Sequence, residues 1–270
     1  MALFRYIFHV FSSVIPENNR FERIWKLAQV DFKKRYYNDR LGLIWALLNP
    51  IFHVLIYYIV FTLAFSRSIG GIDNYALFLF SGLIFWMAFT ETCRKGMRVL
   101  YQKRYLIQNI RVNKVDLYLS NTFSVFLGFF FNLLVFIFLC GLFGFIPTSK
   151  YLFLPILIIN LFILSMGVSM ILSFIHIYFK DINHLIDIVF LLGFWGSGIM
   201  FDSEVLFEKV RIFYYMNPFI GIIKNCRSII LYQDQIDISL MSINIMTGII
   251  MLIAGNFLIV NKSYRVYENM

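Results

Sequence analysis

The chain has 270 residues, of which 60% are hydrophobic and 14% are charged, and its mean hydropathy is +0.75. This composition excludes an ordinary soluble domain and indicates an integral membrane protein. A formal net charge of +9 would suggest nucleic-acid binding in a soluble protein. In a membrane protein we expect the membrane, and not a nucleic acid, to be the partner.

The N-terminal region, residues 1–43, is predicted to lie on the cytoplasmic surface of the membrane. On a helical wheel, apolar and aromatic side chains of residues 20–36 share one arc, while most charged ones lie opposite. The arc contains Phe21, Ile24, Trp25, Ala28, Phe32 and Tyr36. This pattern is typical of an interfacial helix, and the alternative is an amphipathic helix of a soluble domain. We favour the membrane surface because the helix runs directly into an uncharged segment.

That uncharged segment begins a predicted transmembrane domain, residues 44–270. Its first 22 residues, 44–65, would measure about 33 Å as a helix, which is enough to cross a hydrocarbon core. At the start of this first span, Gly42 gives the backbone freedom to turn, and Trp45 suits the headgroup level. Pro50 falls in the first turns, where its missing N–H costs least.

Five further spans are predicted from the remaining apolar segments. They cover about residues 75–93, a part of 117–149, and residues 151–179, 182–201 and 238–261. The fifth is predicted to be short or broken, because it holds polar residues in its first half and three glycines in its second. Residues 212–233 are apolar but contain a proline and two basic residues, which favours re-entrant or interfacial helices. The predicted fold is therefore all-α, with six transmembrane helices, an N-terminal amphipathic interfacial helix, and re-entrant helices between spans 5 and 6.

The basic residues predict the orientation of these spans. Of the 24 Lys and Arg residues, 18 lie in the N-terminal region, the loops after spans 2 and 4, and the C-terminal end. Only six lie in the alternate loops. By the positive-inside rule, both termini are expected to be cytoplasmic.

No catalytic, cofactor or metal site is expected in this chain. Spans 1, 3 and 4 carry no ionisable acid or base except His53 and His176, which argues against a pump driven by an ion gradient. The sequence lacks a glycine-rich phosphate loop, so any ATP must be hydrolysed by a partner. The three cysteines have no metal-binding or redox spacing. Asp181, His184 and Asp187 could bind a divalent metal, but we prefer to interpret them as a polar loop that leads into a helix.

Four stretches of the chain resemble the membrane subunits of ABC transporters that export lipid-linked polysaccharides such as O antigen, capsule and teichoic acid. They are KKRYYNDRLGLIWALLNP at 33–50, SGLIFW at 81–86, YFKDINHLIDIVFLLGFWGSGIMF at 178–201 and MNPFIGIIKNCRSIILY at 216–232. The resemblance runs nearly end to end. Two positions depart from it, since many members have Arg in place of Lys180 and Pro in place of Gly198.

The resemblance implies a half-transporter in the bacterial cytoplasmic membrane. Two copies of the chain would form a conduit for an undecaprenyl-linked polysaccharide, and two copies of a separate ATPase would bind ATP and Mg²⁺, so this chain itself would hold no cofactor. Residues 94–114 with Arg104, together with Lys180 and Asp181, would dock on the ATPase. The alternatives are a related export permease for a drug or lipid, a membrane enzyme of glycan or lipid metabolism that uses the Asp181 cluster, and a structural membrane protein.

Overall fold

The structure is a computed structural model that describes residues 19–35, 40–60, 75–109 and 112–261. The described residues form helices and connecting turns, with no strand among them. The helices are α2 (Arg20–Lys34), η1 (Gly42–Ile44), α3 (Trp45–Tyr58), α4 (Tyr75–Gln102), α5 (Arg104–Asn109), α6 (Lys114–Leu142), η3 (Ser149–Phe153), α7 (Leu154–Tyr178), α8 (Ile182–Gly196), α9 (Glu204–Lys209), α10 (Arg211–Met216), α11 (Pro218–Ile230) and α12 (Ile238–Asn261).

Four helices are long and apolar enough to cross a membrane. They are α4, α6, α7 with the preceding η3, and α12, at the positions of predicted spans 2, 3, 4 and 6. The apolar helix α8 has 15 residues, or about 23 Å, and is therefore shorter than a hydrocarbon core of about 30 Å. The apolar helix α3 has 14 residues and ends at Tyr58, close to residues that the structure does not describe. The prediction that the fifth segment is short is confirmed. The rest of predicted span 1, residues 61–65, lies outside the described residues.

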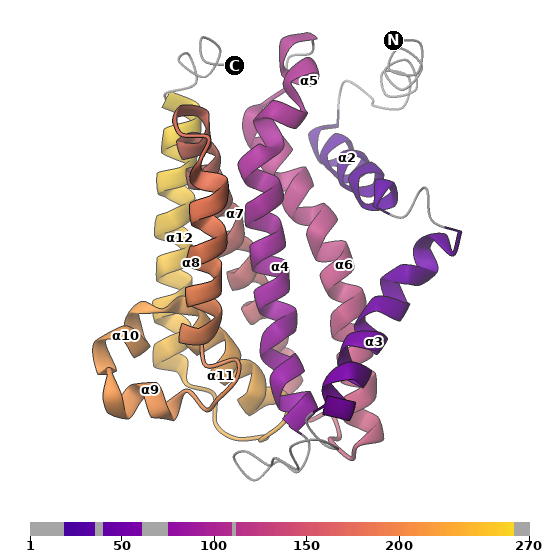
Figure 1. Cartoon of the computed structure of the whole chain (residues 1–270), viewed down its shortest axis with the longest axis vertical. Helices are drawn as coiled ribbons and strands as arrows, with labels where there is room; N and C mark the ends of the chain where they lie inside the picture. The colour runs from indigo at the N-terminus through magenta and orange to yellow at the C-terminus, as the bar shows by residue number, and fades with distance from the viewer. Residues whose placement is uncertain (1–18, 36–39, 61–74, 110–111, 262–270) are drawn as a thin grey trace.

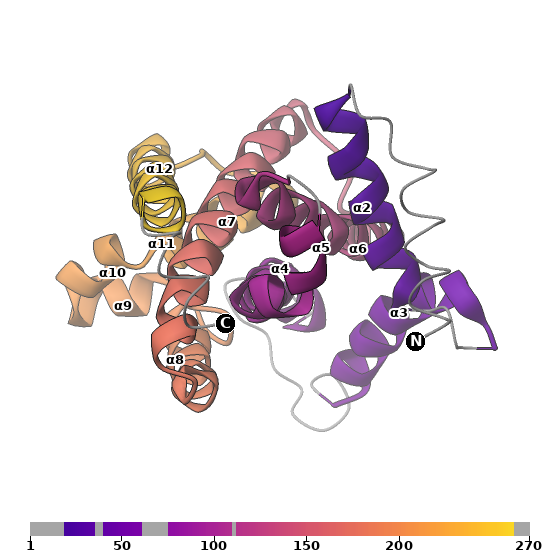
Figure 2. The same ribbon diagram turned by 90° about the horizontal axis from the view of Figure 1, so that it is seen from above.

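The membrane helices run alternately in opposite directions (Figure 1). We call the end that carries α2, α5 and the α7–α8 turn the α5 end, and the end that carries α9, α10 and α11 the α11 end. In Figure 2, α4 lies at the centre, with α3, α6, α7 and α8 around it. It is the most buried of the four long helices, and its aromatic side chains pack into the core.

Close helix packing fixes α7 against α12. A Cβ atom added to Gly167 on α7 would clash with the backbone of Leu252 on α12, so only glycine permits this approach. Because lipid tails are as apolar as leucine, such close backbone contact and interhelical hydrogen bonds hold membrane helices together. One such hydrogen bond joins α6 to α7, where the Tyr118 hydroxyl donates to Ser173 Oγ at 2.7 Å.

The chain turns where the sequence predicts at the start of α3. Gly42 has a φ of +52°, in the left-handed region that glycine adopts without strain, and Trp45 is the first residue of α3. Pro50 lies inside α3 and is buried. Gly198, after α8, has a φ of +69°. Proline, whose ring holds φ near −65°, could not adopt that conformation, so this turn differs in shape from one built on Ser-Pro.

A buried arginine holds the α11 end together. Arg227 of α11 is 2% exposed, and its guanidinium donates to the carbonyl oxygens of Gly198 and Ile199 at 2.8 Å. It also donates to Phe78 O and Ser81 Oγ of α4, both at 3.2 Å. From the sequence, the basic residues of 212–233 only disfavoured a crossing of the membrane by this segment as a continuous helix. The structure shows that Arg227 ties α11 to α4 and to the segment that follows α8.

Candidate functional site

The turn between α7 and α8 presents charge at the α5 end. Phe179, Lys180 and Asp181 are all exposed. The Asp181 carbonyl accepts a hydrogen bond from the backbone N–H of His184 at 3.0 Å, which fixes the turn to the first residues of α8. The Asp181 side chain makes no capping hydrogen bond to the helix. Its carboxylate therefore remains accessible to a partner while the backbone beneath it is held in place.

Side chains at the start of predicted docking segment 94–114 contact α8 just beyond the other predicted docking residues, Lys180 and Asp181. Arg94 donates to Asp187 Oδ1 at 3.0 Å, and its guanidinium lies over the Phe190 ring, 5.2 Å from the centroid. Arg98 Nε donates to Asn183 Oδ1 at 3.1 Å. Arg104 is exposed at the start of α5, at the same end of the molecule (Figure 1). The predicted docking segments thus share one end, and α4 is cross-linked to α8 beside the turn.

The three side chains considered as an alternative metal site, Asp181, His184 and Asp187, do not form a group that could hold a metal ion. Asp187 forms an ion pair with Arg94, and Asp181 and His184 are exposed at the start of α8. No group of three His, Cys, Asp or Glu side chains in the described part of the chain could hold a metal ion.

Ion pairs also hold α2 at the α5 end, on the other side of α4 from α8 (Figure 2). Arg20 and Arg23 lie 2.7 Å and 3.5 Å from the carboxylate of Asp116, which is fully buried in the first turn of α6. Its hydrogen bond and its charge raise the pKa of the Arg20 guanidinium. Further along α2, Asp31 Oδ2 lies 2.5 Å from Lys103 Nζ, in the turn between α4 and α5. α2 is therefore bound both to α6 and to the turn between α4 and α5 inside predicted docking segment 94–114.

The apolar side of α2 packs on protein as well. Phe32 is buried and stacks on Phe131 of α6, with ring centroids 6.0 Å apart, and Trp25 meets Phe123 edge to face at 6.3 Å. Phe21, from the same predicted arc, is 67% exposed. Tyr36 lies outside the described residues. The helical wheel identified a continuous apolar arc, and the structure places part of it against α6.

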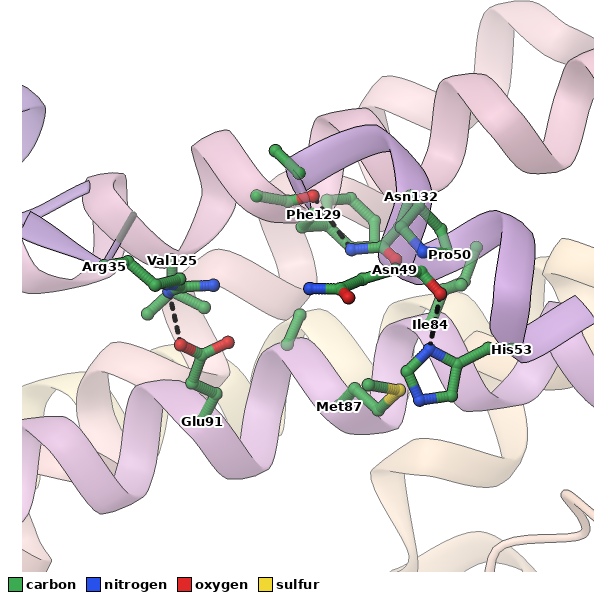
Figure 3. A pocket seen from close by; sticks show the side chains of 13 residues that line it. Arg35, Asn49, Pro50, His53, Ile84, Met87, Glu91, Val125, Phe129 and Asn132 are labelled. Carbon is green, nitrogen blue, oxygen red and sulfur yellow. Dashed lines mark hydrogen bonds and ion pairs between the residues drawn. The ribbon is translucent and has the colours of Figure 1, made fainter. Parts of the chain in front are cut away.

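A polar pocket lies between α3, α4 and α6 (Figure 3), with a volume of about 120 Å³. Five polar side chains line it: Arg35, Asn49, His53, Glu91 and Asn132. The rest of the lining is apolar and comes from Ala46, Pro50, Ile84, Met87, Ala88, Val125, Gly128 and Phe129. Sequence reasoning noted the histidine but missed the pocket, because its polar residues come from separate helices.

Two of the polar side chains in the pocket form an ion pair. Arg35, just after α2, pairs with Glu91 of α4, and Lys95 Nζ lies 2.8 Å from the same carboxylate. His53 Nδ1 lies 2.8 Å from the backbone oxygen of Asn49. Figure 3 shows the side chains of Asn49, His53 and Glu91 directed toward the space between α3 and α4.

Comparison with known proteins gives matches over most of the chain. The family model for the ABC-2 type transporter matches residues 22–231. The O-antigen export system permease protein RfbA of Klebsiella pneumoniae is 25% identical over 249 residues, which cover 92% of this chain and 95% of that protein. The protein of the same name from Myxococcus xanthus is 25% identical over 205 residues, which cover 75% of this chain and 78% of that protein. The polysialic acid transport protein KpsM of Escherichia coli is 21% identical over 204 residues, which cover 74% of this chain and 78% of that protein.

The matched region has the architecture described above. It begins in α2, includes α3 to α11, and contains the α7–α8 turn and all residues that line the pocket. Four helices of the structure are long and apolar enough to cross a membrane. This chain is an integral membrane protein that belongs to the ABC-2 type transporter family.

Proposed function

We propose that this chain is the transmembrane subunit of an ATP-driven exporter that moves an undecaprenyl-linked polysaccharide across the bacterial cytoplasmic membrane. The observation that carries the proposal is the match over 92% of the chain to a permease named for O-antigen export. A second relative is named for the transport of polysialic acid, which is also a polysaccharide. A related permease for a drug or lipid is the alternative, and it differs in substrate alone.

The exporter would contain two copies of this chain and two ATPase subunits, with six crossings per copy and both termini in the cytoplasm. The shorter helices support the two additional crossings, because their apolar side chains are uncovered. On α8 these exposed side chains are Leu185, Ile188, Val189, Leu191, Leu192 and Trp195. A helix with such a surface needs lipid or another chain around it. The short helices α9 to α11 would then form the re-entrant or interfacial region at the external, α11 end.

Energy would enter at the α5 end. Lys180 and Asp181 are exposed on a turn of fixed backbone, and Arg104 is exposed at the same end. The sequence has no phosphate loop of its own. We therefore propose that these three residues contact the ATPase, which binds ATP and Mg²⁺.

The test is complementation in a strain that lacks the gene for this chain. Expression of the chain should restore polysaccharide on the cell surface, and an affinity tag on it should co-purify an ATPase that contains a phosphate loop. The matched control is the same strain with that ATPase inactivated at its phosphate-loop lysine, which should export nothing. Surface polysaccharide that is unchanged by deletion of the gene would contradict the proposal.

A further inference from the structure

The helix α3 covers the polar pocket but is only weakly packed against the rest of the chain. Of its described side chains, only Ala46 and Pro50 are buried, and both line the pocket. Its apolar residues, such as Ile51 and Leu55, are exposed on the outer side. Asn49 and His53, one helical turn apart, are directed inward (Figure 3). α3 thus places polar side chains toward protein and apolar ones away from it.

Polar side chains in a membrane segment are costly and commonly mark a functional path. In the described part of the chain, the side-chain amide of Asn49 and the Nε2 atom of His53 make no hydrogen bond. The Asn132 amide nitrogen donates to Gly128 O at 2.9 Å, and its oxygen has no hydrogen bond there either. These three groups border a space of about 120 Å³, the volume of roughly four water molecules.

The chemistry of the pocket fits hydroxyl groups better than a phosphate. Arg35 and Glu91 pair with each other, and Lys95 also contacts that carboxylate, so the guanidinium already has an anionic partner. Amide and imidazole groups offer both donors and acceptors, and each sugar hydroxyl is also both. The Phe129 ring supplies an apolar wall, which suits the C–H face of a sugar ring.

We propose that this pocket is a binding subsite for a single sugar residue of the exported glycan, held through its hydroxyls by Asn49, His53 and Asn132. The inference rests on the proposed function for the identity of the glycan. The volume limits the subsite to one edge of one sugar. The α4 residues that line the pocket, from Ile84 to Glu91, lie midway along that helix, so the subsite lies near the middle of the bundle, beside the ion pair that Glu91 forms with Arg35 at the end of α2.

The experiment measures protection of a single thiol in the pocket. Met87 lines the pocket and is 39% exposed, whereas all three native cysteines are buried. The variant Met87→Cys, purified with its ATPase and placed in lipid nanodiscs, is alkylated with N-ethylmaleimide. Octyl β-glucoside, which carries one sugar, should slow alkylation at least threefold, and tetraethylene glycol monooctyl ether should not. The control Met251→Cys, on the exposed side of α12, should show no protection by either compound.

A second set of variants tests the recognition itself. Adding Asn49→Ala and Asn132→Ala to Met87→Cys should abolish protection by the glucoside while the complex still elutes with its ATPase. Equal protection by both compounds would show that the octyl chain alone binds, and absence of protection would show that no sugar binds; either result overturns the subsite. Normal export by cells that carry Asn49→Ala and Asn132→Ala would also overturn it. None of these three results would contradict the exporter function, which the complementation experiment tests separately.

Discussion

Helices α2 and α8 lie on two sides of α4 (Figure 2), and they are held at the α5 end in different ways. On one side, α2 is held through Asp116, whose side chain is fully buried, and through the Lys103–Asp31 pair, whose side chains are 12% and 26% exposed. On the other side, the Arg94–Asp187 pair that holds α8 has side chains 50% and 62% exposed. An exposed ion pair contributes little to stability, whereas a buried charge must be paired with an opposite charge. The ion pairs of α2 are therefore expected to hold that helix more firmly at this end than the ion pair of α8 holds α8.

The burial of α8 is also consistent with a weak attachment. Only Ile186 and Phe190 of its 15 residues are buried. Beyond its last turn, the carbonyl oxygens of Gly198 and Ile199 are fixed by Arg227. We hypothesise that a push on the α7–α8 turn pivots α8 about this fixed end while α2 and α4 stay in place.

The largest effect is expected from charges placed in the α2–α6 contact. Trp25→Glu combined with Phe32→Glu would set two carboxylates against Phe123 and Phe131. Burying an unpaired charge costs several kcal/mol, so the variant should fail to assemble or to export. The measurement is the amount of subunit in the membrane together with surface polysaccharide. Phe21→Glu, at an exposed position of α2, is the matched control; normal export by the double variant would show that this contact does not anchor the helix.

A smaller effect is expected from the buried ion pair. Asp116→Ala removes the hydrogen-bond acceptor of Arg20 and the ion-pair partner of Arg23, and a charged hydrogen bond contributes about 1.5–3 kcal/mol. We expect a loss of about 2 kcal/mol, seen as a lower thermal unfolding midpoint of the purified complex. The control Glu22→Gln removes an exposed pair with Lys26 and should change stability by less than about 0.5 kcal/mol. Equal midpoints for the two variants would show that the buried Asp116 contact contributes no more to stability than the Glu22–Lys26 pair.

The smallest effect on stability is expected on the α8 side. Asp187→Ala breaks an ion pair whose two side chains are each at least half exposed, so the unfolding midpoint should change by the equivalent of less than about 1 kcal/mol. The same thermal measurement applies. A loss as large as that of Asp116→Ala would show that α8 is as firmly attached as α2.

The sequence predicted those parts of the fold that depend on apolar length. Spans 2, 3, 4 and 6 follow from uncharged runs that only a membrane or a large core could accommodate. It could not predict which partner the arc of α2 would meet, since a helical wheel does not distinguish lipid from the rings of α6. From the sequence, Arg227 could be recognised only as an unusual charge in an apolar stretch. Its contacts could not be predicted, because the groups that accept its hydrogen bonds belong to α4 and to the turn after α8.

The candidate site was predictable to a similar extent. The short charged turn at Lys180 and Asp181 follows from the spacing of two apolar segments, and the structure finds it exposed. Its contact with an ATPase stays a prediction. The pocket was not predictable, because Asn49 and Asn132 are 83 positions apart and meet only through the packing of α3 against α6.

The central claim is that energy enters through the α7–α8 turn, and Asp181→Ala tests it most directly. The Asp181 side chain makes no capping bond, so its removal should cost under about 1 kcal/mol and leave the subunit inserted at a normal level. Surface polysaccharide and ATPase activity of the co-purified complex are measured together, with Glu208→Ala, an exposed acid at the α11 end, as control. We predict that export falls steeply in Asp181→Ala and stays normal in Glu208→Ala. Wild-type export from both Asp181→Ala and Lys180→Ala would contradict the account.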